Sequence, residues 1–143
     1  MLHNIDPKLW GKHFWATAHY ITISYPNNPT DKEKDNVKNF FGLLAELLPC
    51  ANCRAHYKNN LKMFPLTDDI LNSKYKLIEW LVNLHNEVNG RTGKNIISVE
   101  EAIEIYTKPY QNLSEKYTNF FTIFLLILLI FVLVYYTKYC NDF

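Results

Sequence analysis

This sequence has almost no excess of positive over negative charge, few cysteines and little strand-like alternation of apolar and polar residues. Each of these shortages excludes a class of protein. The chain has 15 Lys and Arg against 14 Asp and Glu, so it lacks the basic surplus of a nucleic-acid-binding domain. Its 3 cysteines cannot build a paired disulfide framework, and its first residues lack the pattern of a secretory signal peptide. A reactive or metal-binding cysteine pair is therefore favoured over a structural disulfide.

Neither alternating β-strand patterns nor a βαβ rhythm occurs in residues 1–112. Short apolar stripes at helical spacing, joined by polar turns, occupy this region instead. The sequence therefore predicts an all-α fold, a small helical bundle, and argues against a thioredoxin fold.

Helix start signals locate the first two predicted helices. Asp6 followed by Pro7 is typical of a helix N-terminus, and this helix is expected to run to about Tyr25. Thr30 and Glu33 form a capping-box pattern at the start of a second helix.

Three more helices are predicted further along the chain. Pro49 suits the first turn of a helix that carries the cysteine pair. Ser73 opens a fourth helix, which Gly90 is expected to end. A capping-box pattern at residues 98–101 opens a short fifth helix that should end before Pro109.

A long uncharged segment, residues 120–136, reads FFTIFLLILLIFVLVYY. As a helix it would span roughly 25 Å, slightly less than the hydrocarbon core of a bilayer. A buried core helix that is apolar on every face would need a larger protein around it. We therefore predict a single-pass, tail-anchored membrane protein whose working domain faces the cytosol.

This prediction divides the chain into a domain, a linker, an anchor and a short tail, at residues 1–112, 113–119, 120–136 and 137–143. Cys140 in the tail is expected to be inert, with palmitoylation or a bond between chains as the alternatives.

Cys50 and Cys53 are spaced as a CxxC motif at the start of a predicted helix. Two cysteines at this spacing form a redox pair or half of a metal site. The positive end of the helix would lower a thiol pKa and favour the reactive thiolate.

A structural zinc site is the alternative interpretation, and it would make the chain a membrane-tethered interaction module. Its ligands would be Cys50, Cys53 and His56, together with one of His13, His19 or His85.

Two predicted helices carry aromatic, amide and basic groups on one face each. A helical Trp usually belongs to the core, and a single His usually has a satisfied partner. The two faces together would also suit a flat ligand with a polar edge, through stacking and hydrogen bonds. The residues concerned are Lys12, Trp15 and His19 on the first helix, and His85 and Asn89 on the fourth, with Asn86 beside them.

Three segments resemble, in order, the motifs of the Erv/ALR family of FAD-linked sulfhydryl oxidases. They are residues 11–19 (GKHFWATAH) with Tyr25-Pro26, residues 48–53 (LPCANC), and residues 80–89 (WLVNLHNEVN) with Gly93-Lys94. The first is similar to the opening motif of the family, the second to its active-site turn and the third to its flavin-binding segment.

The resemblance implies a four-helix bundle with a short fifth helix, which holds FAD noncovalently and commonly forms a homodimer. Cys53 would lie nearest the isoalloxazine ring, with Cys50 outward to meet substrate. The residues implied to contact the cofactor are Lys12, Trp15, His19, Tyr25, His85, Asn86, Asn89, Lys94 and Tyr106.

The implied activity is the oxidation of protein dithiols to disulfides. Electrons would pass from the CxxC pair through FAD to molecular oxygen, with release of hydrogen peroxide. The chain lacks the structural disulfides and the second, shuttle CxxC of cellular members, so a client or a small redox partner would react directly at Cys50. In this respect the chain resembles the short members of the family that are found in large cytoplasmic DNA viruses. This resemblance suggests a virion or host membrane as its location.

Overall fold

The computed structural model of this chain describes residues 4–140, apart from the side chains of Tyr110 and Cys140. The predictions for Cys140 and for the end of the tail lie outside the described residues. The chain divides between Tyr106 and Thr107 into two units. The first unit contains the cysteine pair, and the second contains the long apolar segment.

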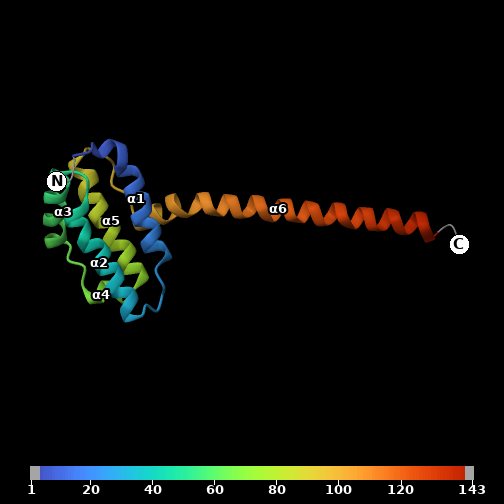
Figure 1. Cartoon of the computed structure of the whole chain (residues 1–143), viewed down its shortest axis with the longest axis horizontal. Helices are drawn as coiled ribbons and strands as arrows, with labels where there is room; N and C mark the ends of the chain where they lie inside the picture. The colour runs from blue at the N-terminus through green and yellow to red at the C-terminus, as the bar shows by residue number, and fades with distance from the viewer. Residues whose placement is uncertain (1–3, 141–143) are drawn as a thin grey trace. The chain divides into compact units, whose positions relative to one another are not determined.

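Six helices make up the described chain, and no β-strand occurs between residues 4 and 140 (Figure 1). They are α1 (Pro7–Ser24), α2 (Asp31–Leu47), α3 (Ala51–Met63), α4 (Asp68–Leu71), α5 (Lys74–Arg91) and α6 (Val99–Cys140). The predicted all-α bundle is therefore confirmed, with the one-turn helix α4 as an addition that the sequence analysis missed.

The core of the first unit lies between two pairs of helices. Helix α1 packs on α5 and α2 packs on α3, while α4 contacts both α5 and α2. Leu77, Leu81 and Leu84 form the fully buried stripe of α5, at the spacing that brings side chains to one helix face. Burying each such side chain stabilises the fold by about 1.5–3 kcal/mol.

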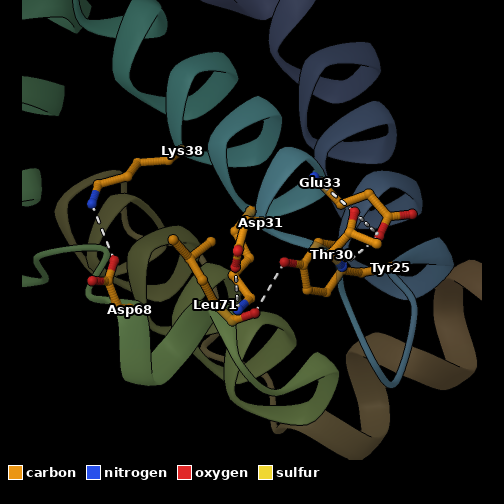
Figure 2. Close-up of polar contacts among 8 residues, drawn as sticks. Tyr25, Thr30, Asp31, Glu33, Lys38, Asp68 and Leu71 are labelled. Atoms are coloured by element: carbon orange, nitrogen blue, oxygen red, sulfur yellow. Dashed lines mark hydrogen bonds and ion pairs between the residues drawn. The ribbon is translucent and has the colours of Figure 1, made fainter.

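Helix α2 begins with the capping box that the sequence predicts (Figure 2). The Thr30 hydroxyl accepts the Glu33 N–H at 3.3 Å, and the Glu33 carboxylate accepts the Thr30 N–H at 2.7 Å. The Thr30 N–H, and secondly the Thr30 hydroxyl, which also donates to this carboxylate at 2.7 Å, lower the pKa of Glu33. An ion pair of 3.2 Å between Lys38 and Asp68 joins α2 to α4.

Two predicted helix boundaries are wrong by a few residues. Cys50 is the N-cap of α3, so Pro49 precedes the helix and does not lie in its first turn. Helix α5 continues through Gly90, and its terminating glycine is Gly93, whose φ of 68° is left-handed. A side chain is disfavoured at such a φ, which is why glycine ends the helix there.

The predicted fifth helix is wrong in its length, because α6 continues through Pro109 as far as Cys140. A proline inside a helix removes one backbone hydrogen bond. The bond lost at Pro109 would have ended on the carbonyl of Ile105, an exposed residue, so water can bond that carbonyl instead. The start of α6 belongs to the first unit, and it packs on α5 through Ala102, which lies against Ile78 and Val82.

Candidate active site

The cysteine pair forms the first turn of α3. Cys50 and Cys53 are joined in a disulfide, with their Cα atoms 5.1 Å apart. The Cys53 N–H donates a hydrogen bond of 3.1 Å to the Cys50 sulfur. A helix N-terminal N–H stabilises negative charge, so this bond favours a thiolate at Cys50 whenever the disulfide is open.

The N-terminal segment holds this turn in place. The Asn4 side-chain oxygen accepts the Ala51 N–H at 2.8 Å, and the Ile5 N–H donates to the Pro49 carbonyl at 2.7 Å. Trp10 in turn donates its indole N–H to the Ile5 carbonyl at 3.1 Å. The bond to Asn4 satisfies the Ala51 N–H, which the start of α3 leaves without a helical partner, and the other two bonds tie α1 and the N-terminal segment to the turn.

A cavity of about 330 Å³ opens beside the cysteine pair, and Cys53 lies on its wall. Ligand pockets in proteins usually measure about 300–1,000 Å³. Cys50 is absent from the residues that line this cavity. The lining is mostly apolar and aromatic: Pro7, Trp10, Gly11, Phe14, Trp15, Leu48, Cys53, His56, Tyr57, Asn60, Val88, Arg91 and Thr92.

Next to the cavity, α1, α5 and α6 bring four rings together. Trp15, on the cavity wall, stacks on His85 with ring centroids 3.8 Å apart and planes 7° apart. The His19 Nε2 lies 3.0 Å from the His85 Nδ1. Tyr106 stacks on the other histidine, His19, with centroids 4.3 Å apart. The structure thus brings together Trp15, His19, His85 and Tyr106, four residues that the resemblance assigns to the cofactor, and their contacts with a cofactor stay predictions.

Both histidines of this cluster are neutral at pH 7. Burial, and secondly the neighbouring His85, lowers the pKa of His19 to about 4. Burial, and secondly the positive charge of Lys94, lowers the pKa of His85 to about 4. One ring therefore donates and the other accepts in their shared hydrogen bond. The His19 Nδ1 is buried and has no hydrogen-bond partner among the described residues.

The family model of the Erv1 / Alr family matches residues 12–123, which include the cysteine turn and all four rings. The chain belongs to the Erv1 / Alr family.

Relatives within this family include several viral proteins. A probable FAD-linked sulfhydryl oxidase of Acanthamoeba polyphaga mimivirus is 37% identical over 119 residues, covering 83% of each chain. A FAD-linked sulfhydryl oxidase of African swine fever virus is 37% identical over 106 residues, which are 74% of this chain and 87% of the relative. The resemblance to the viral versions of the family is thereby confirmed.

Solved structures of the Erv1 / Alr family share the fold. The yeast Erv1 core superposes with a TM-score of 0.66 at 24% identity, covering 71% of this chain and 84% of that one. The FAD binding domain of Erv1 from Saccharomyces cerevisiae gives a TM-score of 0.67 at 23% identity, covering 73% and 97%. At these identities the likeness establishes the helical fold.

Two of the residues assigned to the cofactor by resemblance are hydrogen-bonded within the framework. The Tyr25 hydroxyl donates to the Leu71 carbonyl at 2.9 Å (Figure 2). The Asn86 side chain donates to the Ile97 carbonyl at 2.8 Å and accepts the Ile97 N–H at 3.0 Å. Both side chains hold parts of the fold together through these bonds. Their contacts with a cofactor stay a prediction.

The remaining predicted contacts are Lys12, Asn89 and Lys94, and none of them lines the cavity beside Cys53. Lys12 and Lys94 are exposed, although the charge of Lys94 acts on the neighbouring His85. Asn89 is buried, and its backbone carbonyl accepts the Lys94 N–H at 2.9 Å. Cofactor contacts by these three residues also stay predictions.

The sequence analysis missed several residues that line the cavity. Tyr57 and Asn60 follow Cys53 by four and seven positions, so helical spacing alone brings them to the face of Cys53. Trp10 and Phe14 precede Trp15 on α1 and could be found in the same way. Arg91 had no such signal, because it comes from a distant helix.

The zinc alternative finds no support in the described residues. Cys50 and Cys53 are bonded to each other, which leaves no thiolate for a metal. Among residues 4–140, no group of three or more His, Cys, Asp or Glu side chains is placed to hold a metal ion.

Proposed function

We propose that this protein is a FAD-dependent sulfhydryl oxidase that forms disulfide bonds in protein thiols. The observation that carries the proposal is the position of Cys53, half-buried on the wall of an apolar, aromatic cavity and bonded to a cysteine outside that wall. The names of the viral relatives support the same activity.

The residues around the cavity fit a flavin nucleotide. Trp15 lies on the cavity wall and stacks on His85, so this part of the site suits a flat ring with a polar edge. The apolar walls suit the hydrophobic part of a flavin. Two buried nitrogens, the His19 Nδ1 and the Asn60 Nδ2, have no partner among the described residues, and a ligand with polar atoms would satisfy them. When bound, FAD supplies a two-electron acceptor that the protein itself lacks.

The disulfide reacts with its client in two exchange steps. A client thiolate attacks the Cys50 sulfur, the Cys50–Cys53 bond breaks, and Cys53 leaves as a thiolate. A second client thiolate then attacks the client sulfur of the mixed disulfide and releases Cys50. The Cys53 N–H, which contacts the Cys50 sulfur at 3.1 Å, stabilises this leaving thiolate. Two client thiols are thereby oxidised and the cysteine pair is reduced.

The cysteine pair must then be reoxidised, and the proposed final acceptor is molecular oxygen, released as hydrogen peroxide. Because Cys53 lies on the cavity wall, it is the cysteine positioned to pass electrons inward. The immediate donor is a protein dithiol or a small redox partner that reaches Cys50.

Two further proposals concern assembly and location. Helix α2 exposes Phe40, Leu43 and Leu47 on one face, and a second copy in a homodimer would bury such a face. The apolar part of α6 is long enough to cross a membrane, so we propose a single-pass anchor with the catalytic domain in the cytosol.

The test uses the full chain, purified in detergent and loaded with FAD. A dithiol added without air should bleach the flavin absorption, and air should restore it while oxygen is consumed and peroxide forms. Cys53→Ser should keep the flavin but lose bleaching and turnover, whereas the matched control Cys140→Ser should keep both. A chain that binds no flavin, or an active Cys53→Ser enzyme, would refute the proposal.

A further inference from the structure

Two polar residues of the lining of the cavity beside Cys53, Asn60 of α3 and Arg91 of α5, contact each other, and we call this pair the polar corner. Asn60 is only 1% exposed. The Arg91 Nη2 donates to the Asn60 side-chain oxygen at 3.0 Å, and it also lies 3.2 Å from the Glu87 carboxylate. A buried amide and a charged group therefore line a mostly apolar space.

The contact with Arg91 fixes the orientation of the Asn60 amide. A guanidinium group only donates hydrogen bonds, so the amide atom that it contacts must be the oxygen. The Asn60 Nδ2 is thus directed away from Arg91, and it is buried without a partner among the described residues. Buried donors are nearly always paired in folded proteins, so an unpaired one on a cavity wall points to a ligand with an acceptor.

We infer that the Asn60 Nδ2 donates a hydrogen bond to a carbonyl oxygen on the pyrimidine edge of the FAD isoalloxazine ring. This inference rests on the proposed function and adds a contact to it. The isoalloxazine ring combines an apolar benzenoid side with a carbonyl-bearing edge, which matches a mostly apolar cavity whose lining includes the polar corner. Arg91 acts as a positioning residue, because it holds Asn60 with the donor free.

The polar corner should also set the reduction potential of the bound flavin. Reduction adds electron density to the pyrimidine edge of the ring, and a hydrogen-bond donor stabilises that density more strongly after reduction than before it. The positive charge of Arg91 acts in the same direction, although the Glu87 carboxylate offsets part of it. Asn60 therefore favours electron transfer from Cys53 toward the cofactor.

Two substitutions of Asn60 test this role in the full chain, with FAD binding and the flavin midpoint potential as readouts. Asn60→Ala removes the donor. Asn60→Asp keeps the size and the bond from Arg91, but its ionised carboxylate has no proton to donate. The matched control is Asn59→Ala, because Asn59 is the exposed neighbour on the same helix.

We expect both Asn60 variants to bind FAD about tenfold more weakly, the usual effect of one lost hydrogen bond. A tenfold weaker preference for the reduced flavin corresponds to a potential about 30 mV lower. Asn60→Asp should show the larger change, because it also adds a negative charge. Asn59→Ala should match the wild type in both readouts.

The outcomes separate this inference from the proposed function. A wild-type chain that binds no FAD would refute the proposed function itself. A wild type that binds FAD, with Asn60 variants of unchanged affinity and potential, would overturn the inference alone. Weaker binding without a change in potential would also overturn it, since it would make Asn60 a packing residue. If Asn60→Ala does not fold, Asn60→Asp decides.

Discussion

At the residue scale, the buried histidine pair makes the stability of the protein depend on pH. The pKa of His19 is about 4 in the folded chain, against about 6.5 for an unperturbed histidine. Between these values the unfolded chain binds more protons than the folded chain, so the free energy of unfolding falls as the pH falls. His19 contributes on the order of 3 kcal/mol above pH 6.5, and this contribution is lost by about pH 4.

We therefore expect the thermal midpoint of the full chain to be constant between pH 8 and about pH 7 and to fall steeply below about pH 6. Tryptophan fluorescence is a suitable probe, because Trp10, Trp15 and Trp80 all lie in the first unit. His19→Gln removes one titrating ring and should flatten the curve. An unchanged slope in this variant would show that other groups cause the acid sensitivity.

Sequence reasoning singled out Trp15, His19 and His85 because they carry strong local signals, whereas Tyr106 came from the family resemblance alone. Trp15 and His19 are one helical turn apart on α1, and His85 lies in a distinctive run on α5. It missed Asn60 and Arg91 because neither residue type is unusual on a helix surface. Their importance arises only when α3 and α5 pack and bury a donor, which is a tertiary event without a local pattern.

At the scale of the element, the capping box of α2 is a separable source of stability. Thr30→Ala removes the oxygen that accepts the Glu33 N–H, and losing such a cap costs about 1 kcal/mol. The thermal midpoint should fall by about 4–8 °C per kcal/mol for a domain of this size. FAD affinity should not change, since Thr30 does not line the cavity.

Thr30→Ser is the control for this prediction, because it keeps the hydroxyl oxygen and should unfold close to the wild type. A fall in the midpoint as large for serine as for alanine would contradict the capping explanation and implicate the methyl group of Thr30.

Helix boundaries followed from the sequence where a side chain acts on its own helix. Thr30 and Ser73 cap the helices that they were expected to cap. The errors at Gly90 and Pro109 have another cause, since each residue disfavours a helix only by a limited energy that its neighbours can outweigh. The bonds from Asn4 and Ile5 to the cysteine turn could not be foreseen, because they join segments far apart in the chain.

At the scale of the whole molecule, the first unit has the buried core of a protein in water, and the second has the exposed apolar surface of a segment in a bilayer. The first unit has a core in which Leu77, Leu81 and Leu84 are fully buried, whereas the large apolar side chains from Phe120 to Tyr139 are between 46% and 71% exposed. Exposed apolar surface of this extent is unfavourable in water and favourable in a bilayer. A membrane anchor would also keep the oxidase beside clients on the same membrane, which matters in a reducing cytosol.

The anchor proposal predicts that the full chain stays with membranes during alkaline extraction. Leu125→Arg combined with Leu128→Arg places two charges near the centre of the apolar segment, at a cost of about 2.5–3.5 kcal/mol each. This variant should leave the membrane pellet, while the matched control with alanine at both positions should remain in it. Both variants should retain flavin, because the cavity is built within the first unit. Complete extraction of the wild type would contradict the anchor and leave the exposed apolar face of α6 to a protein partner.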